Sequence, residues 1–125
     1  MLQDRDLLSV QEARDMVRKA RVAFEAAKLL SQEQIDKIVK AMSDVAYAHS
    51  EELAKMAAEE TSMGKYEDKI IKNHLASKAV YEAIKDMKTV GIVNEYPEKK
   101  MFEVAVPVGV VCGIVPCTNP TSTTI

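Results

Sequence analysis

The fold of this chain is decided by residues 111–123, which read VCGIVPCTNPTST. The apolar residues before Pro116 are continuous rather than alternating, which is typical of a strand buried on both faces of a parallel sheet. The pair Asn119-Pro120 then supplies an N-cap residue followed by a proline at the first helical position. The stretch therefore predicts a strand over residues 110–115, a short loop and the start of a helix.

A parallel strand needs a neighbour in its sheet. The crossover that brings the chain back beside such a strand takes a dozen or more residues, and too few residues come after Val115 to build one. A single strand of this type would leave backbone polar groups and apolar side chains uncovered. We therefore expect the chain to be the N-terminal piece of a larger protein.

Helix signals fill the chain before residue 89. The capping-box spacing of residues 9–12 predicts the first helix, whose apolar residues recur every three or four positions. A second box at residues 31–34 predicts the next helix. Ser50, followed by two glutamates, predicts a third helix, which Gly64 is placed to end. Residues 66–88 predict a fourth helix, whose broad apolar arc indicates that it is covered on more than one side.

The hydrophobic period then changes from about 3.6 to 2. Residues 89–93 and 101–106 read as strands because they are rich in β-branched and aromatic side chains. The polar residues 94–100 between them predict a turn.

Composition limits the classes of partner. The chain has 125 residues, of which 47% are hydrophobic and 29% charged, as in a soluble globular protein. Its net charge of -2 gives no general attraction to nucleic acid or to an anionic membrane. Cys112 and Cys117 match neither a redox pair nor a zinc pattern, so no metal site is predicted and reduced thiols are expected. Because no secretory signal or membrane span is apparent, we expect a cytoplasmic protein.

Three segments carry a family resemblance. They are EETSMGKYEDKIIKNHLAS at residues 59–77, KDMKTVGIV at residues 85–93, and PVGVVCGIVPCTNPTST at residues 107–123. In this order they resemble the aldehyde dehydrogenase superfamily, and within it the CoA-acylating branch. That branch contains acetaldehyde, butyraldehyde and succinate-semialdehyde dehydrogenases and the aldehyde half of bifunctional aldehyde-alcohol dehydrogenases.

The resemblance implies an α/β fold in three parts. Residues 1–88 would be the helical part of the cofactor-binding domain, and residues 89–107 the start of an oligomerisation β-hairpin. Residues 108–125 would supply the first strand of a Rossmann-like parallel sheet and the start of a helix. The implied reaction interconverts an aldehyde and its acyl-CoA through a cysteine thioester, with NAD or NADP as cofactor and coenzyme A as co-substrate. A homo-oligomer is expected.

Asn119 is the implied catalytic residue. In related non-acylating enzymes, the asparagine of a proline-x-asparagine-x-proline motif steadies the oxyanion of the thiohemiacetal. Here Asn119 comes three positions after Pro116 rather than two, a longer spacing that the acylating branch shares. The simpler interpretation is that Asn119 only caps the following helix, and the two roles are compatible because the amide has both an acceptor and donors.

The neighbouring loop residues are candidates for cofactor contact. The resemblance implies that Val115, Pro116, Cys117 and Thr118 lie beside the nicotinamide ribose and act mainly through backbone groups; a plain strand-to-helix turn is the alternative. Cys117 could itself be a nucleophile at a helix N-terminus, but the family nucleophile lies in a later domain, so the isolated chain is expected to be inactive. His74 is expected to be a hydrogen-bonded packing residue rather than a metal ligand.

Two other functions stay open from the sequence. One is a non-acylating aldehyde dehydrogenase. The other is a self-sufficient helical interaction or assembly module whose apolar tail docks on a partner. The module and the enzyme would differ beyond Ile125, because only the enzyme would continue into the rest of a sheet and a catalytic cysteine.

Overall fold

The structure, a computed structural model, describes residues 4–125. This part of the chain divides into two compact units. One contains residues 4–31 and 89–112, and the other contains residues 32–88 and 113–125. None of the helices within residues 4–125 is long and apolar enough to cross a membrane.

The first helix, α1 (Arg5–Ala27), begins earlier than the sequence predicts. Asp4 is its N-cap, and the Asp4 carboxylate accepts hydrogen bonds from two backbone N–H groups of the first turn at 2.9 and 3.1 Å. Ser9 lies inside the helix, where its hydroxyl donates to the carbonyl of Arg5 at 3.0 Å. The predicted capping box at residues 9–12 is therefore wrong. Asp4 starts the helix because its carboxylate accepts hydrogen bonds from the first turn. Its negative charge also interacts favourably with the positive end of the helix dipole.

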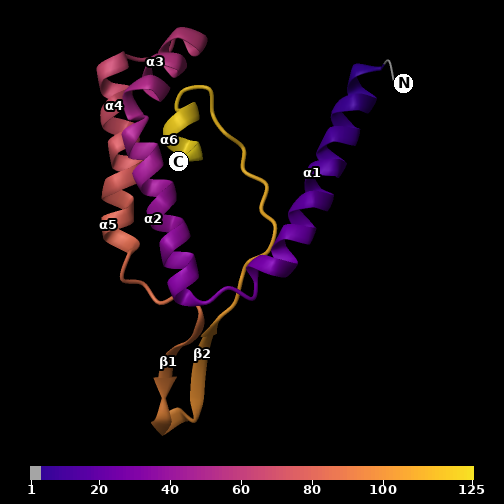
Figure 1. Cartoon of the computed structure of the whole chain (residues 1–125), viewed down its shortest axis with the longest axis vertical. Helices are drawn as coiled ribbons and strands as arrows, with labels where there is room; N and C mark the ends of the chain where they lie inside the picture. The colour runs from indigo at the N-terminus through magenta and orange to yellow at the C-terminus, as the bar shows by residue number, and fades with distance from the viewer. Residues whose placement is uncertain (1–3) are drawn as a thin grey trace. The chain divides into compact units, whose positions relative to one another are not determined.

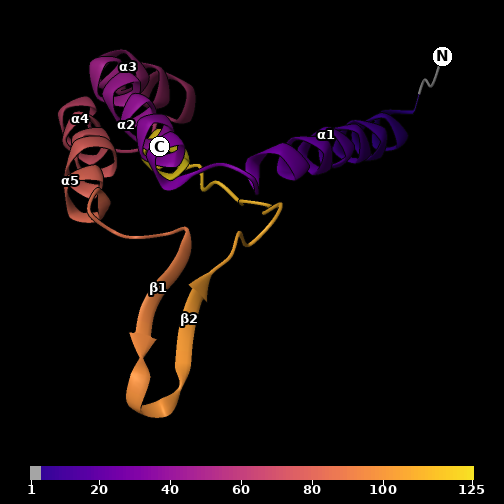
Figure 2. The same cartoon turned by 60° about the horizontal axis from the view of Figure 1, so that its bottom comes forward.

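The two predicted strands are present as an antiparallel pair. Strand β1 (Gly91–Tyr96) pairs with β2 (Met101–Ala105), in a register that runs from Gly91 opposite Ala105 to Tyr96 opposite Met101. A single 3₁₀ turn, Pro97–Lys99, connects the strands (Figure 2). The turn is shorter than predicted because β1 continues to Tyr96.

A charged hydrogen bond crosses this hairpin. The hydroxyl of Tyr96 donates to the carboxylate of Glu103 at 3.1 Å. This bond and the nearby negative charge raise the pKa of Tyr96, because both oppose loss of the phenol proton. The stabilisation is therefore fully present below the pKa of an unfolded tyrosine and is lost as the pH rises through the raised value.

Glu103→Gln is expected to lower the pKa of Tyr96 toward that of a free tyrosine, because the substitution removes the charge. The measurement is an ultraviolet absorbance titration, in which Tyr96→Phe identifies the contribution of this residue among the four tyrosines. An unchanged titration of Tyr96 in Glu103→Gln would contradict the assignment.

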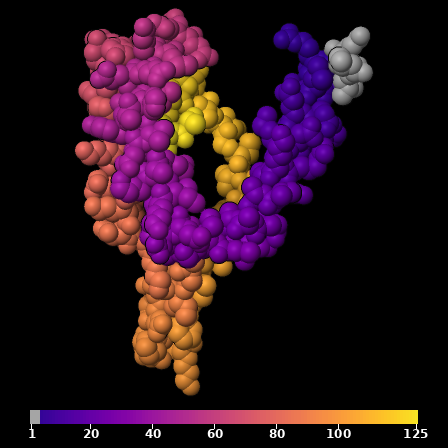
Figure 3. All heavy atoms as spheres, in the orientation of Figure 1, coloured from indigo at the N-terminus to yellow at the C-terminus, as the bar shows by residue number. Residues whose placement is uncertain are grey.

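The second unit is helical. Its α-helices and one π-helical turn are α2 (Gln32–Ala48), α3 (Ser50–Thr61), α4 (Tyr66–His74), the π turn Leu75–Ala79, α5 (Val80–Ile84) and α6 (Pro120–Thr124). In Figure 1, α4, the π turn and α5 form one continuous rod beside α2, and the short α6 packs against α3 and α4. The space-filling view shows the yellow C-terminal residues in contact with this helical group (Figure 3).

Two helix ends differ from the prediction. Helix α3 ends at Thr61, and Ser62 takes the left-handed conformation with φ 53°. Gly64 lies beyond that cap, with its own positive φ of 76°, so it does not end the helix itself. The predicted fourth helix ends at Ile84 rather than residue 88.

The π turn explains the broad apolar arc of the fourth helix. A π turn accommodates an extra residue, so side chains after it move to a different face of the rod. The sequence predicts that other elements cover this helix on more than one side. Residues 4–125 do not provide such cover, because Ile71, Leu75 and Val80 all remain exposed.

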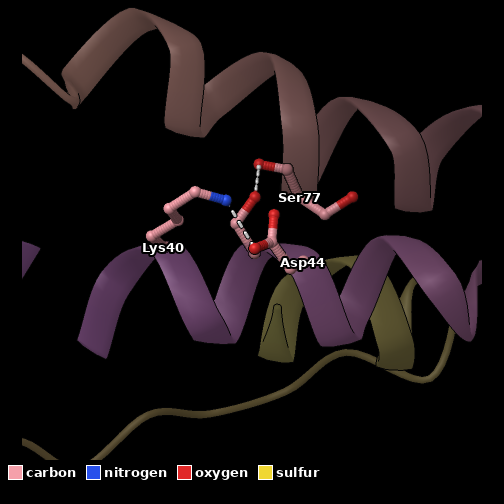
Figure 4. A network of polar contacts seen from close by, with 4 residues as sticks. Lys40, Asp44 and Ser77 are labelled. Carbon is pink, nitrogen blue, oxygen red and sulfur yellow. Dashed lines mark hydrogen bonds and ion pairs between the residues drawn. The ribbon is translucent and has the colours of Figure 1, made fainter. Parts of the chain in front are cut away.

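The core of this unit is largely polar. Its buried apolar residues are Ala54 and Ala57, and its buried polar or charged residues are Ser43, Ser50, Lys69, Asn73 and Ser77. Ser43 donates to the carbonyl of Ser77 at 3.3 Å, close to the exposed Lys40–Asp44 ion pair on α2 (Figure 4). Throughout residues 4–125, every buried side-chain nitrogen or oxygen atom has a hydrogen-bond partner. The helices are therefore held together by directional contacts.

The predicted strand over residues 110–115 is not formed. Val111 and Ile114 are 72% and 93% exposed, and no strand hydrogen bonds involve this segment. A strand requires a neighbour, and β1 and β2 pair with each other. The helices and the hairpin of the expected α/β fold are thus present, whereas the first strand of the parallel sheet is not.

Candidate functional site

The candidate site residues are consecutive in the loop that leads into α6. Asn119 is the N-cap of this helix and Pro120 occupies its first turn, as predicted. The backbone N–H of Asn119 donates to the carbonyl of Pro116 at 3.3 Å, which closes a tight turn around Cys117 and Thr118. Val115, Pro116, Cys117 and Thr118 are exposed, and Asn119 is partly buried.

The side chain of Asn119 does not cap the helix. Its Oδ1 accepts a hydrogen bond from the Nζ of Lys72 at 2.8 Å, and its Nδ2 donates to the hydroxyl of Thr118 at 3.3 Å. Side-chain capping, the simpler interpretation of Asn119, is therefore wrong, because the carboxamide oxygen is already engaged by an ammonium group.

One face of α4 holds this loop. The Nζ of Lys69 donates to the carbonyl of Thr118 at 3.2 Å, and the Oδ1 of Asn73 accepts from the hydroxyl of Thr121 at 2.8 Å. Lys69, Lys72 and Asn73, which we call the α4 anchor, are three and four residues apart and so share a helix face. Sequence reasoning missed the α4 anchor, because this spacing shows only that the three residues share a helix face and not what that face contacts.

The anchor is well supported in the fold. Asn73 is 0% exposed, and its Nδ2 donates to the carbonyl of Ser50 at 2.9 Å, where α3 begins. Lys69 is 4% exposed. A buried polar group that has its hydrogen bonds is fixed in place, because any other position would leave it unsatisfied.

Within residues 4–125, Cys117 makes no hydrogen bond to a base. Its thiol is exposed and lies 3.8 Å from the sulfur of Met63, a thioether that cannot remove a proton at neutral pH. The chain has two histidines, and both are bonded elsewhere. His49 contacts Glu52 at 3.0 Å, and the Nε2 of His74 contacts the hydroxyl of Ser50 at 2.8 Å. This arrangement does not make Cys117 an activated nucleophile.

His74 is the packing residue that the sequence predicts. Besides its bond to Ser50, its ring packs against the ring of Tyr47 in α2, with centroids 4.6 Å apart and an angle of 33° between the ring planes. Within residues 4–125, no group of three or more histidine, cysteine or acidic side chains is arranged to hold a metal ion.

A hollow lies between α2 and the part of the rod formed by the π turn and α5. It has a volume of about 400 Å³ and is lined mainly by charged and tyrosine side chains. Lys40 pairs with Asp44 and Lys85 with Glu82, and these hydrogen-bonded partners raise the pKa of both lysines. Its charges therefore largely compensate one another, and it contains none of the predicted site residues.

The chain is similar to several known proteins. The sequence pattern of the Aldehyde dehydrogenase family matches residues 4–125. The chain is 49% identical over 110 residues to a succinate-semialdehyde dehydrogenase (acetylating) of Clostridium kluyveri, covering 88% of this chain. It superposes with a TM-score of 0.93 and 55% identity on a probable aldehyde dehydrogenase from Listeria monocytogenes, over 96% of this chain. It superposes on an acetylating aldehyde dehydrogenase from Geobacillus thermoglucosidasius with a TM-score of 0.94 and 47% identity, over 97% of this chain.

The match covers only part of each relative. The chain spans 24% of the Clostridium enzyme and 26% and 27% of the two solved structures. On this chain itself the match is nearly complete, and it includes the α4 anchor and the loop before α6. The chain belongs to the aldehyde dehydrogenase family.

Proposed function

We propose that this chain is the N-terminal part of a CoA-acylating aldehyde dehydrogenase, which interconverts an aldehyde and its acyl-CoA in the cytoplasm. The Clostridium and Geobacillus relatives are acetylating enzymes, which supports this branch over a non-acylating one. The observation within the chain that carries the proposal is the orientation of Asn119. Its carboxamide oxygen faces Lys72, and one of its N–H groups donates to Thr118, so the second N–H group is available for a substrate.

In the proposed reaction, a cysteine thiolate outside this chain adds to the carbonyl carbon of the aldehyde, and the carbonyl electron pair moves onto oxygen. The Nδ2 of Asn119 would donate a hydrogen bond to that oxyanion. A donor fixed before the charge develops lowers the barrier, because it does not need to reorient during the reaction.

The loop before Asn119 fits a role beside the cofactor. NAD or NADP would accept the hydride, and coenzyme A would accept the acyl group. Val115, Pro116, Cys117 and Thr118 are exposed and adjacent to Asn119, so their backbone groups are accessible to a ribose. A turn closed by its own hydrogen bond keeps those groups in a fixed position.

The hairpin is proposed to begin a contact between subunits. Met101, Phe102 and Val104 of β2 are all exposed, which is unusual for neighbouring large apolar side chains on a free surface. A homo-oligomer would cover them.

The reaction class is tested with the full-length enzyme and a short aldehyde. We expect reduction of the nicotinamide cofactor that depends on coenzyme A, with acyl-CoA as the product identified by mass spectrometry. If the free carboxylic acid forms without coenzyme A as fast as the cofactor is reduced with it, the acylating assignment is contradicted.

Cys117→Ser is expected to keep kcat within about twofold of the wild-type value, because the thiol has no base and serine fits the same exposed position. Steady-state assays of the full-length enzyme measure this, with Cys112→Ser as the matched control. A nearly inactive Cys117→Ser variant beside an active Cys112→Ser variant would assign the nucleophile to Cys117.

A further inference from the structure

We propose that Lys72 is a positioning residue that fixes the orientation of the Asn119 carboxamide, while Lys69 and Asn73 hold the loop that carries it. This inference rests on the proposed role of Asn119 and extends it to the α4 anchor. The residues come from helix α4, 47 to 49 positions before their partners in the sequence.

Lys72 can form a hydrogen bond with only one end of the Asn119 carboxamide. An ammonium group has three donors and no acceptor, so only the oxygen of the carboxamide can face it. Rotating the Asn119 amide by half a turn would bring the two N–H donors against the Nζ of Lys72. The 2.8 Å contact therefore selects one of the two amide orientations.

This orientation leaves one amide donor free. One N–H of Nδ2 donates to the hydroxyl of Thr118 at 3.3 Å. Within residues 4–125, the other N–H has no hydrogen-bond partner. Because Lys72 withdraws electron density from the amide oxygen, it also makes the N–H groups stronger donors. A developing oxyanion would benefit from both effects.

The loop is anchored on both sides of Asn119. Lys69 binds the carbonyl of Thr118, immediately before Asn119, and Asn73 binds the hydroxyl of Thr121, shortly after it. Both anchoring side chains are buried, and Asn73 is also bonded to the carbonyl of Ser50. Asn119 is therefore held from both sides by a single helix, which is the support that a fixed catalytic donor requires.

The test is a double-mutant cycle in the full-length enzyme, with Lys72→Met, Asn119→Ala and the double variant. We expect Lys72→Met to lower kcat about tenfold, with the KM for the nicotinamide cofactor changed less than about twofold. In the Asn119→Ala background, Lys72→Met should change kcat less than about twofold, because its effect passes through Asn119. Lys72→Arg should recover most of the lost turnover, since a guanidinium also donates without accepting.

The matched control is Lys55→Met, which removes an exposed lysine of α3 that faces Glu59. It should leave kcat within about twofold of wild type. A similar loss in Lys55→Met, or an equal loss from Lys72→Met with and without Asn119, would overturn the inference. The inference would also be overturned if Lys72→Met had wild-type turnover while Asn119→Ala was slow.

These results separate the two proposals. If Asn119→Ala turns over normally, the oxyanion role fails and the inference about Lys72 fails with it. If Asn119→Ala is slow and Lys72→Met is not coupled to it, the oxyanion role survives and only the positioning role fails.

Discussion

Asn119→Ala in the full-length enzyme is expected to lower kcat by about a hundredfold while changing the KM for the nicotinamide cofactor less than about twofold. The reason is that the proposed hydrogen bond from Asn119 to the substrate oxygen would become strong only when that oxygen carries negative charge. An interaction made mainly in the transition state affects turnover more than binding. Steady-state kinetics in the direction of aldehyde oxidation provide the measurement.

Asn119→Asp provides a sharper version of the same test. A carboxylate is nearly isosteric with the carboxamide and can still accept from Lys72, but it has no donor for the oxyanion. Its kcat should fall at least as far as that of Asn119→Ala. The matched control is Asn94→Ala, which removes an exposed asparagine of β1 that bonds Glu103. Normal turnover in Asn119→Asp would exclude Asn119 as the donor.

Asn73→Leu is expected to have the largest effect on stability, lowering the free energy of unfolding by about 3 kcal/mol. Leucine has a similar volume, but it cannot bond the carbonyl of Ser50 or the hydroxyl of Thr121, which are 2.9 and 2.8 Å from the Asn73 carboxamide. The carbonyl of Ser50 would then lose this bond in the buried core, and the hydroxyl of Thr121 would lose its bond at a partly buried position. The urea midpoint of the full-length protein measures the loss.

The control for this variant is Asn94→Leu, at an exposed position, where a change below about 0.5 kcal/mol is expected. Asn73→Asp adds a chemical test of the bond to Ser50. It replaces the N–H donor by a carboxylate oxygen that faces a carbonyl oxygen, and so it should also destabilise. Equal midpoints for Asn73→Leu and Asn94→Leu would contradict the structural role of Asn73.

Local signals predicted the helices and the hairpin well. The second and third helices begin within one residue of the serines that mark them, although the N-cap of α3 is His49, which makes no side-chain capping bond. The start of α1 was harder to predict because Asp4 and Ser9 are both capping types, and the sequence alone does not rank them. The π turn was not recognised in the sequence. Its extra residue moves the following apolar side chains to another helix face, and this gives the same pattern as one wide apolar face.

Features that depend on distant residues could not be predicted. The apolar pattern of residues 110–115 predicts a strand, but a strand forms only beside another one, and no local pattern supplies that neighbour. The α4 anchor was missed for a related reason. Lysines on a helix usually face solvent, and only the folded chain brings Lys69 and Lys72 to the loop before α6. The roles of Asn119 and of residues 115–118 remain predictions.

The carboxamide of Asn73 has a mechanical consequence. One end of it is tied to the carbonyl of Ser50 and the other to the hydroxyl of Thr121, so it acts as a strut of constant length between the first residue of α3 and the first turn of α6. Hydrogen bonds tolerate little stretching, whereas apolar contacts can slide. The start of α3 therefore cannot shift without stretching or breaking one of these two bonds, unless Thr121, two residues from Asn119, shifts with it.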